Sequence, residues 1–470
     1  MKKVLLFAAA ALCAASAFAA IDNVEYENQA GLMCKNKWLK SLNSDEREGA
    51  QDWANLPFAN SNYARTALVL GDKIYVAESR PTVVEEGGEP KTYNYATLHE
   101  FDLVSGDLIK STTLTNDGSP IISPSPLSFN QIQVDNYGHV WGCGYTANAH
   151  NAPLRPYVID LESGAVTYQG ECIVPDEEES TAGRVDYLDV VGDITGVEAD
   201  GILMTAPSNA DNIYAYRWRR AQGTDEWVGD CDDYVSLILE ESYPAGQAKW
   251  GGATLLTIVD DEDNTGDQFY IDDFTTCPVL YNTTGGAVDG FQNCVALAPK
   301  VGCNGVAEFS IAGRPMIAWV HNQYDVSYDA DIAPAGGCVI KVGELGEGMS
   351  YEALQSYWVL PKEGLGMTSD GGNRIHNIGT FAIKDENEKE GVLLLTFKCR
   401  NGMGVYLIAE EGFIDPYGGV EGVATDNSTV VSESYYNVLG QKVLNPAAGQ
   451  VYVKVAKLSN GATVSSKVVR

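Results

Sequence analysis

The sequence lacks the short motifs that mark many enzyme centres. It contains no G-x-S-x-G elbow, no H-E-x-x-H pair, no phosphate-binding loop and no dinucleotide fingerprint after a strand. Histidine is scarce as well, with five residues in 470, and no two of them have a metal-ligand spacing. These absences argue against a serine hydrolase of the elbow type, a zinc protease and a nucleotide-dependent enzyme.

Positive charge is also scarce. The chain has 31 lysines and arginines against 64 aspartates and glutamates, and its formal net charge is −33. A surface of this kind repels phosphate backbones and anionic lipid headgroups. We therefore expect no nucleic-acid partner and no membrane insertion, and the acidity suits a protein outside the cell.

Long hydrophobic runs are absent except at the N-terminus. Lys2 and Lys3 precede an apolar run over residues 4–15, and Ala17-Phe18-Ala19 has the small-x-small pattern of a cleavage site. The run is too short to span a bilayer. Residues 1–19 are therefore predicted to be a secretory signal peptide. The mature protein is expected to pass through the periplasm and to be secreted or held at the cell surface.

Nine of the ten cysteines remain after this cleavage. The odd number leaves at least one thiol unpaired, and the absence of C-x-x-C argues against a zinc ribbon or a redox pair. Export to an oxidising compartment permits disulfides, and Cys294 with Cys303, which bracket a short loop, are the first candidates for a pair. Cys13 within the leader raises a lipoprotein alternative, which the large Leu12 before it disfavours.

Helical periodicity is nearly absent from the body of the chain. Its clearest examples are short, EREGAQDW at 46–53 and SYEALQSYW at 350–358. Elsewhere short runs of Val, Ile, Leu, Tyr and Thr alternate with turn residues, which is typical of β-strands. Two segments are close copies, because D-x-x-S-G turns at Asp102–Gly106 and Asp160–Gly164 each separate two apolar strands. Aspartate and serine cap such a turn, and its glycine takes positive φ.

A second kind of strand recurs in phase with these turns. Its six copies are residues 71–79, 137–146, 200–208, 251–261, 313–323 and 389–399. A repeated supersecondary unit with variable loops fits the four-stranded blade of a β-propeller. We predict an all-β fold, a propeller of about six four-stranded blades over residues 51–412, with residues 20–50 supplying a strand or cap that closes the ring. A pair of β-sandwiches is the main alternative, and five or seven blades also fit the spacing.

The end of the chain differs from the body. Residues 413–433 are rich in Gly, Ser, Thr and Asp and are predicted to be a linker. Residues 434–470 contain three short segments with alternating faces, YYNVLGQKV, GQVYVKV and VSSKVVR. These segments predict a small C-terminal β-sandwich-like tail.

In order, spacing and terminal position, the three segments resemble the C-terminal sorting domain of cargo of the type IX secretion system of Bacteroidota. In that family a YN–LGQKV strand is followed by a GVYVVKV–NGK strand and a basic, valine-rich end. The resemblance covers residues 435–470 and implies export across the outer membrane, with residues 434–470 engaging the secretion machinery. The body is similar in style to exported propellers of the same bacteria.

An acidic loop offers a candidate metal site. Asp261, Asp263, Thr265 and Gly266 follow the D-x-D-x-x-G opening of a calcium loop, and Asp272 stands at the position of the closing carboxylate. Carboxylates at alternate positions can surround one hard cation, so Ca²⁺ is the predicted cofactor. An ordinary acidic hairpin loop is the alternative, because no flanking helices are predicted.

Aromatic residues at strand ends are the strongest candidates for ligand binding. In a propeller, strand ends and the loops after them line one rim of the disc, where an exposed ring can stack on a sugar or on an apolar side chain. A histidine at a strand end can point into the central channel. The predicted binding residues are Trp141, Tyr145, Trp319, His321, Tyr324, Arg374 and His376. The alternative is that the aromatic rings fill the cores between blades.

These features favour a non-catalytic binding or scaffold protein outside the cell, which recognises an extracellular glycan or a surface protein through one rim of the propeller. No catalytic residue is predicted. The alternative is a hydrolase or lyase that acts on polysaccharide with acidic residues at the central channel, and a structural surface component is a third class. A deep central pocket with two close carboxylates would favour a glycosidase, whereas exposed Trp and Tyr on a shallow rim would favour binding.

Overall fold

The computed structural model describes residues 26–42, 53–59, 61, 63–121, 129, 131–144, 153–173, 184–198, 201–206, 213–221, 223–224, 226–229, 235–237, 255–259, 266, 268–272, 279–282, 287–290, 301–302, 305–323, 339–345, 355–362, 364–365, 376–417, 430–437, 442–443, 451–458 and 463–469. The chain forms two compact units, Met1–Phe413 and Ile414–Arg470. Among the described residues no helix is long and apolar enough to cross a membrane.

Six antiparallel sheets build the first unit, and each is one blade. From the inner strand outward they consist of β2 (Ala64–Leu70), β3 (Lys73–Glu86), β4 (Glu89–Asp102) and β5 (Leu108–Thr113); β8 (Gln131–Val134), β9 (Val140–Cys143), β10 (Pro156–Ile159) and β11 (Val166–Tyr168); β12 (Asp189–Val191), β13 (Ile202–Thr205), β14 (Ile213–Arg220) and β15 (Trp227–Gly229); β17 (Leu255–Ile258), β18 (Gln268–Asp272), β19 (Val279–Asn282) and β20 (Ala287–Gly290); β22 (Val306–Ile311), β23 (Arg314–Gln323), β24 (Val339–Glu344) and β25 (Gln355–Leu360); and β26 (His376–Lys384), β27 (Glu390–Lys398), β28 (Gly402–Glu410) and β1 (Leu32–Ser41).

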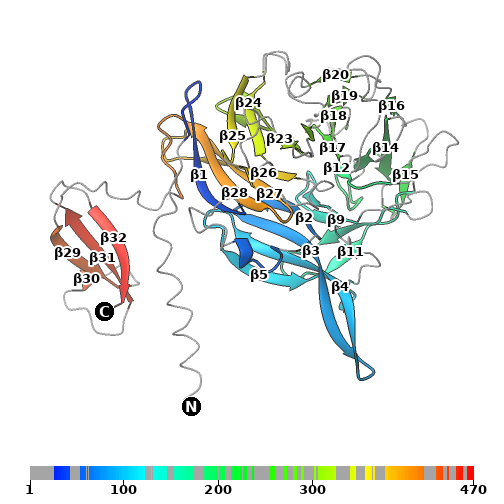
Figure 1. Ribbon diagram of the computed structural model, residues 1–470, viewed down its shortest axis with the longest axis horizontal. Coiled ribbons are helices and arrows are strands. Elements are labelled where there is room, and N and C mark those ends of the chain that lie inside the picture. Colours follow the sequence, from blue (N-terminus) through cyan, green and yellow to red (C-terminus); the bar gives the residue numbers. More distant parts are fainter. Residues whose placement is uncertain are drawn as a thin grey trace. The chain divides into compact units, whose positions relative to one another are not determined.

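Three short additions complete this unit. β16 (Val235–Leu237) also pairs with β14, and β21 (Val301–Gly302) pairs with β23 beyond the end of β22. β6 (Thr115–Asn116) and β7 (Ser119–Pro120) form a separate two-stranded ribbon. Figure 1 shows the sheets arranged around a centre near β2, β12, β17 and β26. The fold is therefore the predicted β-propeller, with six blades of four strands.

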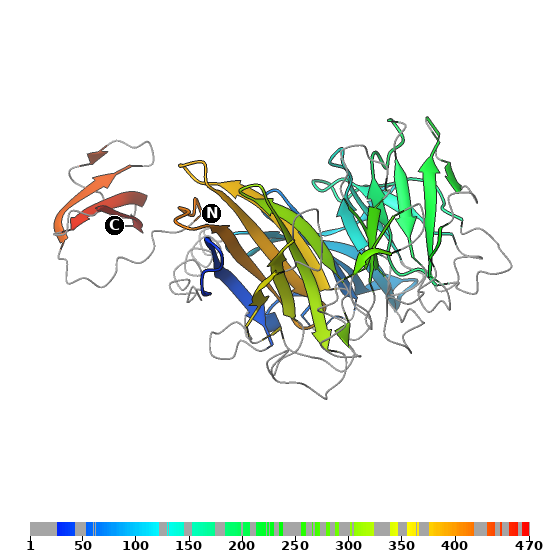
Figure 2. The ribbon, with the colours of Figure 1, turned by 90° about the horizontal axis from the view of Figure 1, so that it is seen from above.

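The ring is closed by a strand from the opposite end of the chain. β1 pairs antiparallel with β28, with Leu32 opposite Glu410, and becomes the outer strand of the sixth blade. Figure 2 shows the dark-blue β1 beside the orange strands of that blade. The buried indole of Trp38 on β1 donates a hydrogen bond of 2.9 Å to the carbonyl of Leu103 in the first blade. β1, within the segment 20–50 predicted to supply a strand or cap, is thus the strand that closes the ring.

The repeated turns of the sequence all connect third and fourth strands. The two D-x-x-S-G turns lie between β4 and β5 and between β10 and β11, and their glycines, Gly106 and Gly164, have φ of 71° and 74°. In each turn one oxygen of the aspartate, Asp102 or Asp160, accepts two backbone N–H groups at 2.8–2.9 Å. The local chemistry of these turns explains why they revealed the repeat.

Two predictions about strands are wrong. Residues 251–261 contain β17, an inner strand, whereas the other five segments of that series fall on second strands. Residues 355–360 form β25 rather than part of a helix. β25 is the outer strand of the fifth blade, where Trp358 pairs with Val342 and is buried. The need to cover this blade overrides the helical preference of the local residues.

The antiparallel strands give the propeller two faces. Connections from first to second and from third to fourth strands lie on one face, which we call the turn face, and the other connections lie on the opposite face, which we call the loop face. Connections on the turn face include tight ones, such as 71–72 and 312–313. The loop face carries long ones, such as 42–63 and 324–338. Long loops on a rigid scaffold are the common place for binding residues.

One hairpin projects beyond the blades. β3 pairs with β2 only as far as Glu78, and β4 pairs with β5 only as far as Thr97, but β3 and β4 stay paired to Glu86 and Glu89. The outer half of this hairpin is mostly exposed, and it extends away from the other strands in Figure 1.

Neighbouring blades are joined by hydrogen bonds from backbone N–H groups to side chains. Inner strands splay apart and do not pair as a continuous sheet, so their buried N–H groups need other acceptors. These interblade hydrogen bonds run from Ala67 to Asn377 Oδ1 (2.9 Å), Ile132 to Thr66 Oγ1 (3.0 Å), Leu188 to Gln131 Oε1 (2.6 Å), Ile258 to Asp189 Oδ2 (2.6 Å) and Gly305 to Asp272 Oδ2 (3.3 Å).

The second unit is one antiparallel sheet in its described part. Its order is β30 (Lys442–Val443), β29 (Val430–Tyr436), β31 (Val451–Leu458) and β32 (Thr463–Val469). The three segments noted in the sequence fall on β29 with β30, on β31 and on β32. β29 begins at Val430, within the residues predicted to be a linker.

Candidate functional site

The inner strands of all six blades line one cavity at the centre of the propeller. Its volume is about 520 Å³. Aliphatic residues share its wall with acids, amides and hydroxyls. The polar residues that line it within the strands are Gln131, Gln133, Asp189, Thr257, Tyr270, Glu308, Asn377 and Thr380. The cavity is therefore suited to a ligand that forms many hydrogen bonds.

Glu308 is the most distinctive group in this central channel. It lies in the middle of β22, half-buried, where Phe309 and Ala307 flank it in the strand. The buried phenol of Tyr270, from the second strand of the preceding blade, donates a hydrogen bond to Glu308 Oε1. Burial raises the pKa of the Glu308 carboxyl to about 7. The group is thus divided between its protonated and ionised forms near neutral pH.

Asp189 is the second acid of the channel, and its role differs. Burial raises its pKa to about 7, although N–H groups of Ile258 and Val190 donate to it. These bonds measure 2.6 Å and 2.9 Å. The first of them joins the third blade to the fourth. Asp189 therefore joins two blades through a backbone N–H group, whereas the interblade hydrogen bond of Glu308 comes from a side chain, the phenol of Tyr270.

The two carboxyl groups do not resemble an acid–base pair. Catalysis by two carboxyls at neutral pH needs environments that push their pKa values apart, so that one is protonated and the other ionised. Here burial raises the pKa of both Asp189 and Glu308, each to about 7. These environments do not assign one group as the acid and the other as the base.

The prediction that Trp141 and Trp319 stack on a ligand is wrong. Their relative exposures are 0% and 1%. Both belong to second strands, β9 and β23, and Trp141 packs in a core cluster with Trp218 and Leu203 of the third blade. The alternative drawn from the sequence, that such rings fill the cores between blades, fits Trp141.

Two of the other predicted binding residues are described by their backbone. His321 lies near the end of β23 and His376 begins β26, so both backbone positions are at the loop face. Tyr145, Tyr324 and Arg374 lie outside the described residues. These five remain predicted binding residues.

Asp272, the predicted closing ligand of a calcium loop, ends β18, about 13 Å along the strand from Gln268. Its buried carboxylate accepts the interblade hydrogen bond from Gly305. The other predicted ligands, Asp261, Asp263 and Thr265, lie outside the described residues.

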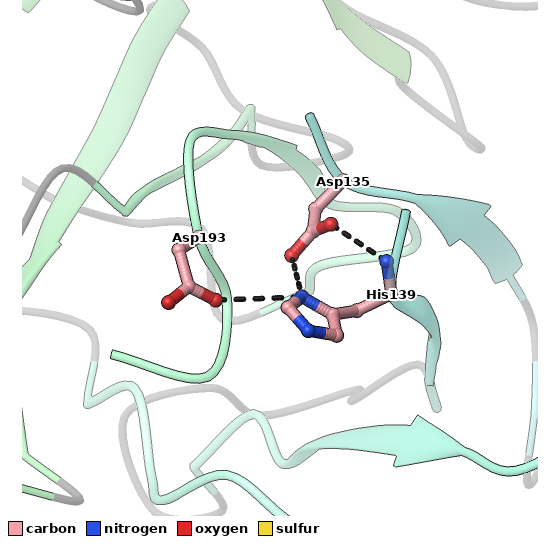
Figure 3. Close-up of side chains that lie close together, drawn as sticks. All are labelled: Asp135, His139 and Asp193. Atoms are coloured by element: carbon pink, nitrogen blue, oxygen red, sulfur yellow. Dashed lines mark hydrogen bonds and ion pairs between the residues drawn. The ribbon is translucent and has the colours of Figure 1, made fainter. Parts of the chain in front are cut away.

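One group of side chains among the described residues is arranged to hold a metal ion. Asp135, His139 and Asp193 offer ligand atoms that all lie within 4.8 Å of one another. His139 Nδ1 is 2.8 Å from Asp135 Oδ2 and 3.4 Å from Asp193 Oδ1, as Figure 3 shows. The residues come from first-to-second-strand connections of the second and third blades, on the turn face, and Asp135 also lines the central channel.

Sequence reasoning missed Glu308 and Tyr270. With 64 acidic residues in the chain, no single carboxylate stands out. The available signal was a charged residue inside the apolar strand VAEFSI, where a buried charge is unfavourable unless it has a role. The tyrosine that contacts it is 38 residues away in the chain, and only the fold brings the two together.

Comparison with known proteins places the chain in no family. No protein-family model matches the sequence, and no curated protein matches it. Solved structures similar to the chain include Saccharomyces cerevisiae Sqt1 (7% identity, 87% of this chain and 97% of that chain, TM-score 0.32), the Dos1 propeller (11%, 86% and 81%, 0.33) and polysaccharide lyase Uly1 (9%, 87% and 90%, 0.34). At such identities and scores these likenesses carry no argument about activity, and the β-propeller assignment rests on the six blades themselves.

Proposed function

We propose that the chain is an exported, non-catalytic binding protein that recognises a hydroxyl-rich ligand, such as the end of an extracellular glycan, in its central channel. Glu308 is the observation that supports this proposal. It is a half-buried carboxyl, hydrogen-bonded by Tyr270, in a cavity of about 520 Å³ lined with amides and hydroxyls. Sugar hydroxyls both donate and accept hydrogen bonds, so this lining complements them.

The proposed site is the channel and its mouth on the loop face rather than a rim of stacked tryptophans. His321 and His376 lie near the loop-face ends of β23 and β26 by their backbone positions. In sequence Tyr324 follows β23, Arg374 precedes β26 and Tyr145 follows β9. A long glycan chain bound at one end by Glu308 would leave the channel on the loop face.

A hydrolase or lyase that acts on polysaccharide is the second candidate. The pKa of Glu308, raised to about 7 by burial, is the value that a general acid needs near neutral pH. A glycosidase also needs a second carboxylate with a separate role. Asp189 serves an interblade hydrogen bond instead, which is why binding is the preferred proposal.

Export is the second part of the proposal. Residues 1–19 would direct the chain to the periplasm, and residues 434–470 would engage a type IX secretion machinery. Fusing residues 414–470 to a periplasmic reporter in a host with that machinery tests the second step. The reporter should appear outside the cell, whereas a fusion that ends at residue 433 should stay in the periplasm.

The binding proposal is tested by a glycan array probed with the mature chain, with and without Ca²⁺. We expect a saccharide hit whose affinity falls about tenfold or more in Glu308→Gln and in Tyr270→Phe. Glu308→Gln replaces a carboxylate oxygen that would accept from the ligand, and Tyr270→Phe removes the phenol that donates to Glu308. Glu386→Gln, in an exposed turn on the turn face, is the charge-matched control and should bind normally. No hit, or equal loss in the control, would contradict the proposal. A Ca²⁺ requirement would support a calcium site within residues 261–265.

A further inference from the structure

Two connections from neighbouring blades meet at the turn face beside His139. Both carboxylates there are buried, and His139 is 37% exposed at its side chain. Asp135 Oδ2 also accepts the N–H of Ile194 at 3.0 Å, across the boundary between the blades. Asp193 is held on both oxygens, by the Thr195 hydroxyl and N–H and by the N–H of Glu198. The carboxylates are therefore fixed before any ligand arrives.

The sixth blade contains a turn equivalent to the one that begins at Asp135, and comparing the two shows which hydrogen bonds the turn itself requires. The equivalent turn has five residues and begins at Asp385. In both turns the N–H of the aspartate donates to the carbonyl of the fifth residue, and the N–H of the fourth residue donates to the carbonyl of the aspartate. These backbone hydrogen bonds measure 3.0–3.1 Å. In both, Oδ1 accepts the N–H groups two and four positions later, at 2.7–3.0 Å.

The two turns differ in the residue at their fifth position. It is His139 in the second blade and Lys389 in the sixth, where the lysine ammonium reaches the carbonyl of Glu411 instead. The turn thus explains Asp135 but not the histidine, and it explains nothing about Asp193, which comes from the next blade. The turn therefore does not account for the position of the His139 imidazole nitrogen beside two carboxylates.

The distances within the cluster match those around one ion. Tetrahedral Zn²⁺ binds nitrogen and oxygen ligands at about 2.0–2.2 Å, which separates neighbouring ligand atoms by about 3.4 Å. Nδ1 lies 2.8 Å and 3.4 Å from its two carboxylate oxygens. An ion can therefore be held between Nδ1 and these oxygens after a shift of about 0.6 Å in the shorter of the two separations. The exposure of the imidazole leaves a path from solvent and room for a water ligand.

We propose that Asp135, His139 and Asp193 form a Zn²⁺ site that joins the second and third blades at the turn-face end of the channel. Two carboxylates neutralise the charge of the ion, and the imidazole favours a transition ion over Ca²⁺, which takes six or more oxygen ligands. The N–H groups of Ile194, Thr195 and Glu198 orient the ligands from outside, as such partners do in zinc sites. The proposal does not depend on a ligand at Glu308.

Calorimetric titration of the untagged, chelator-treated mature chain with ZnCl₂ tests the site. We expect one Zn²⁺ per chain with a dissociation constant of about 1 μM or lower. Asp193→Asn and His139→Lys should weaken binding by about tenfold or more. The lysine is the residue that the sixth blade uses at this position, so this variant is expected to keep the turn.

Asp385→Asn is the matched control, because it loses the same turn carboxylate as Asp135→Asn without touching the cluster. Asp385→Asn should bind Zn²⁺ like the wild type, whereas Asp135→Asn should not. The urea midpoint of each variant shows whether it is folded, and His139→Gln replaces His139→Lys if the lysine unfolds the chain. Absence of saturable binding, binding unchanged in Asp193→Asn and both His139 variants, or equal affinity for Ca²⁺ would overturn the proposal.

Discussion

Replacing Asp189 by asparagine should make the propeller less sensitive to pH. In the folded chain burial raises the pKa of Asp189 to about 7, against a reference value of 3.8. Between these values the folded protein holds a proton that the unfolded chain has released, so the free energy of unfolding falls as pH rises. The slope is about 1.4 kcal/mol per pH unit and levels off as pH passes the folded pKa, which gives about 3 kcal/mol between pH 5 and pH 8 and a plateau above pH 8.

The asparagine variant removes this titration but keeps the interblade bond, because its amide oxygen can still accept the N–H of Ile258. The stability of Asp189→Asn relative to the wild type should therefore rise by about 3 kcal/mol between pH 5 and pH 8. Glu308 titrates in both proteins, so its contribution cancels from the difference. Asp189→Ala lacks the acceptor and should be about 1–3 kcal/mol less stable than Asp189→Asn at every pH.

Urea unfolding of the mature chain, followed by tryptophan fluorescence, measures these differences. All eight tryptophans lie between residues 38 and 358, so the signal reports on the propeller and not on the C-terminal sheet. A difference between Asp189→Asn and the wild type that stays constant from pH 5 to pH 8, or that falls with pH, would refute the account of Asp189.

Three further outcomes are expected. Trp38→Ala removes a fully buried indole from the closing strand and should lower the free energy of unfolding by about 3–5 kcal/mol in the same urea assay; a smaller change would mean that β1 is not needed to close the ring. Gly142→Ala would place a methyl group 2.4 Å from the buried ring of Phe129 and should destabilise the second blade by about 1–3 kcal/mol, which an unchanged urea midpoint would contradict. Deletion of residues 434–470 should leave the tryptophan-detected midpoint unchanged, since the sheet that they help to form belongs to a separate unit, and a large shift would show that the units stabilise each other.

The blades could be predicted from the sequence because their turns are local chemistry. A D-x-x-S-G turn needs an aspartate that caps two N–H groups and a glycine with positive φ, and both requirements are met within five residues, as at Asp102–Gly106. The sequence predicted that residues 20–50 supply a strand or a cap, and the pairing of β1 with β28 shows that the described part of this segment is a strand. β25 was missed because its strand pairing depends on β24 and not on its own residues.

The site could not be predicted in the same way, because it depends on contacts between distant segments. Trp141 and Trp319 follow the strand pattern equally well whether their rings face solvent or a neighbouring blade. His139 and Asp193 are 54 residues apart, and nothing local links them. Glu308 is distinguished from the other acids only by burial and by the phenol of Tyr270, which lies on the second strand of the preceding blade.

We propose that Glu308 binds a ligand without chemistry. The most direct test is titration calorimetry of the best glycan from the array with the wild type and with Glu308→Gln, followed by mass spectrometry of the glycan after prolonged incubation. We expect one glycan per chain, affinity lost in the variant, and a glycan recovered intact. A shortened or unsaturated glycan in the wild-type sample, absent with Glu308→Gln, would contradict it and identify Glu308 as a catalytic acid.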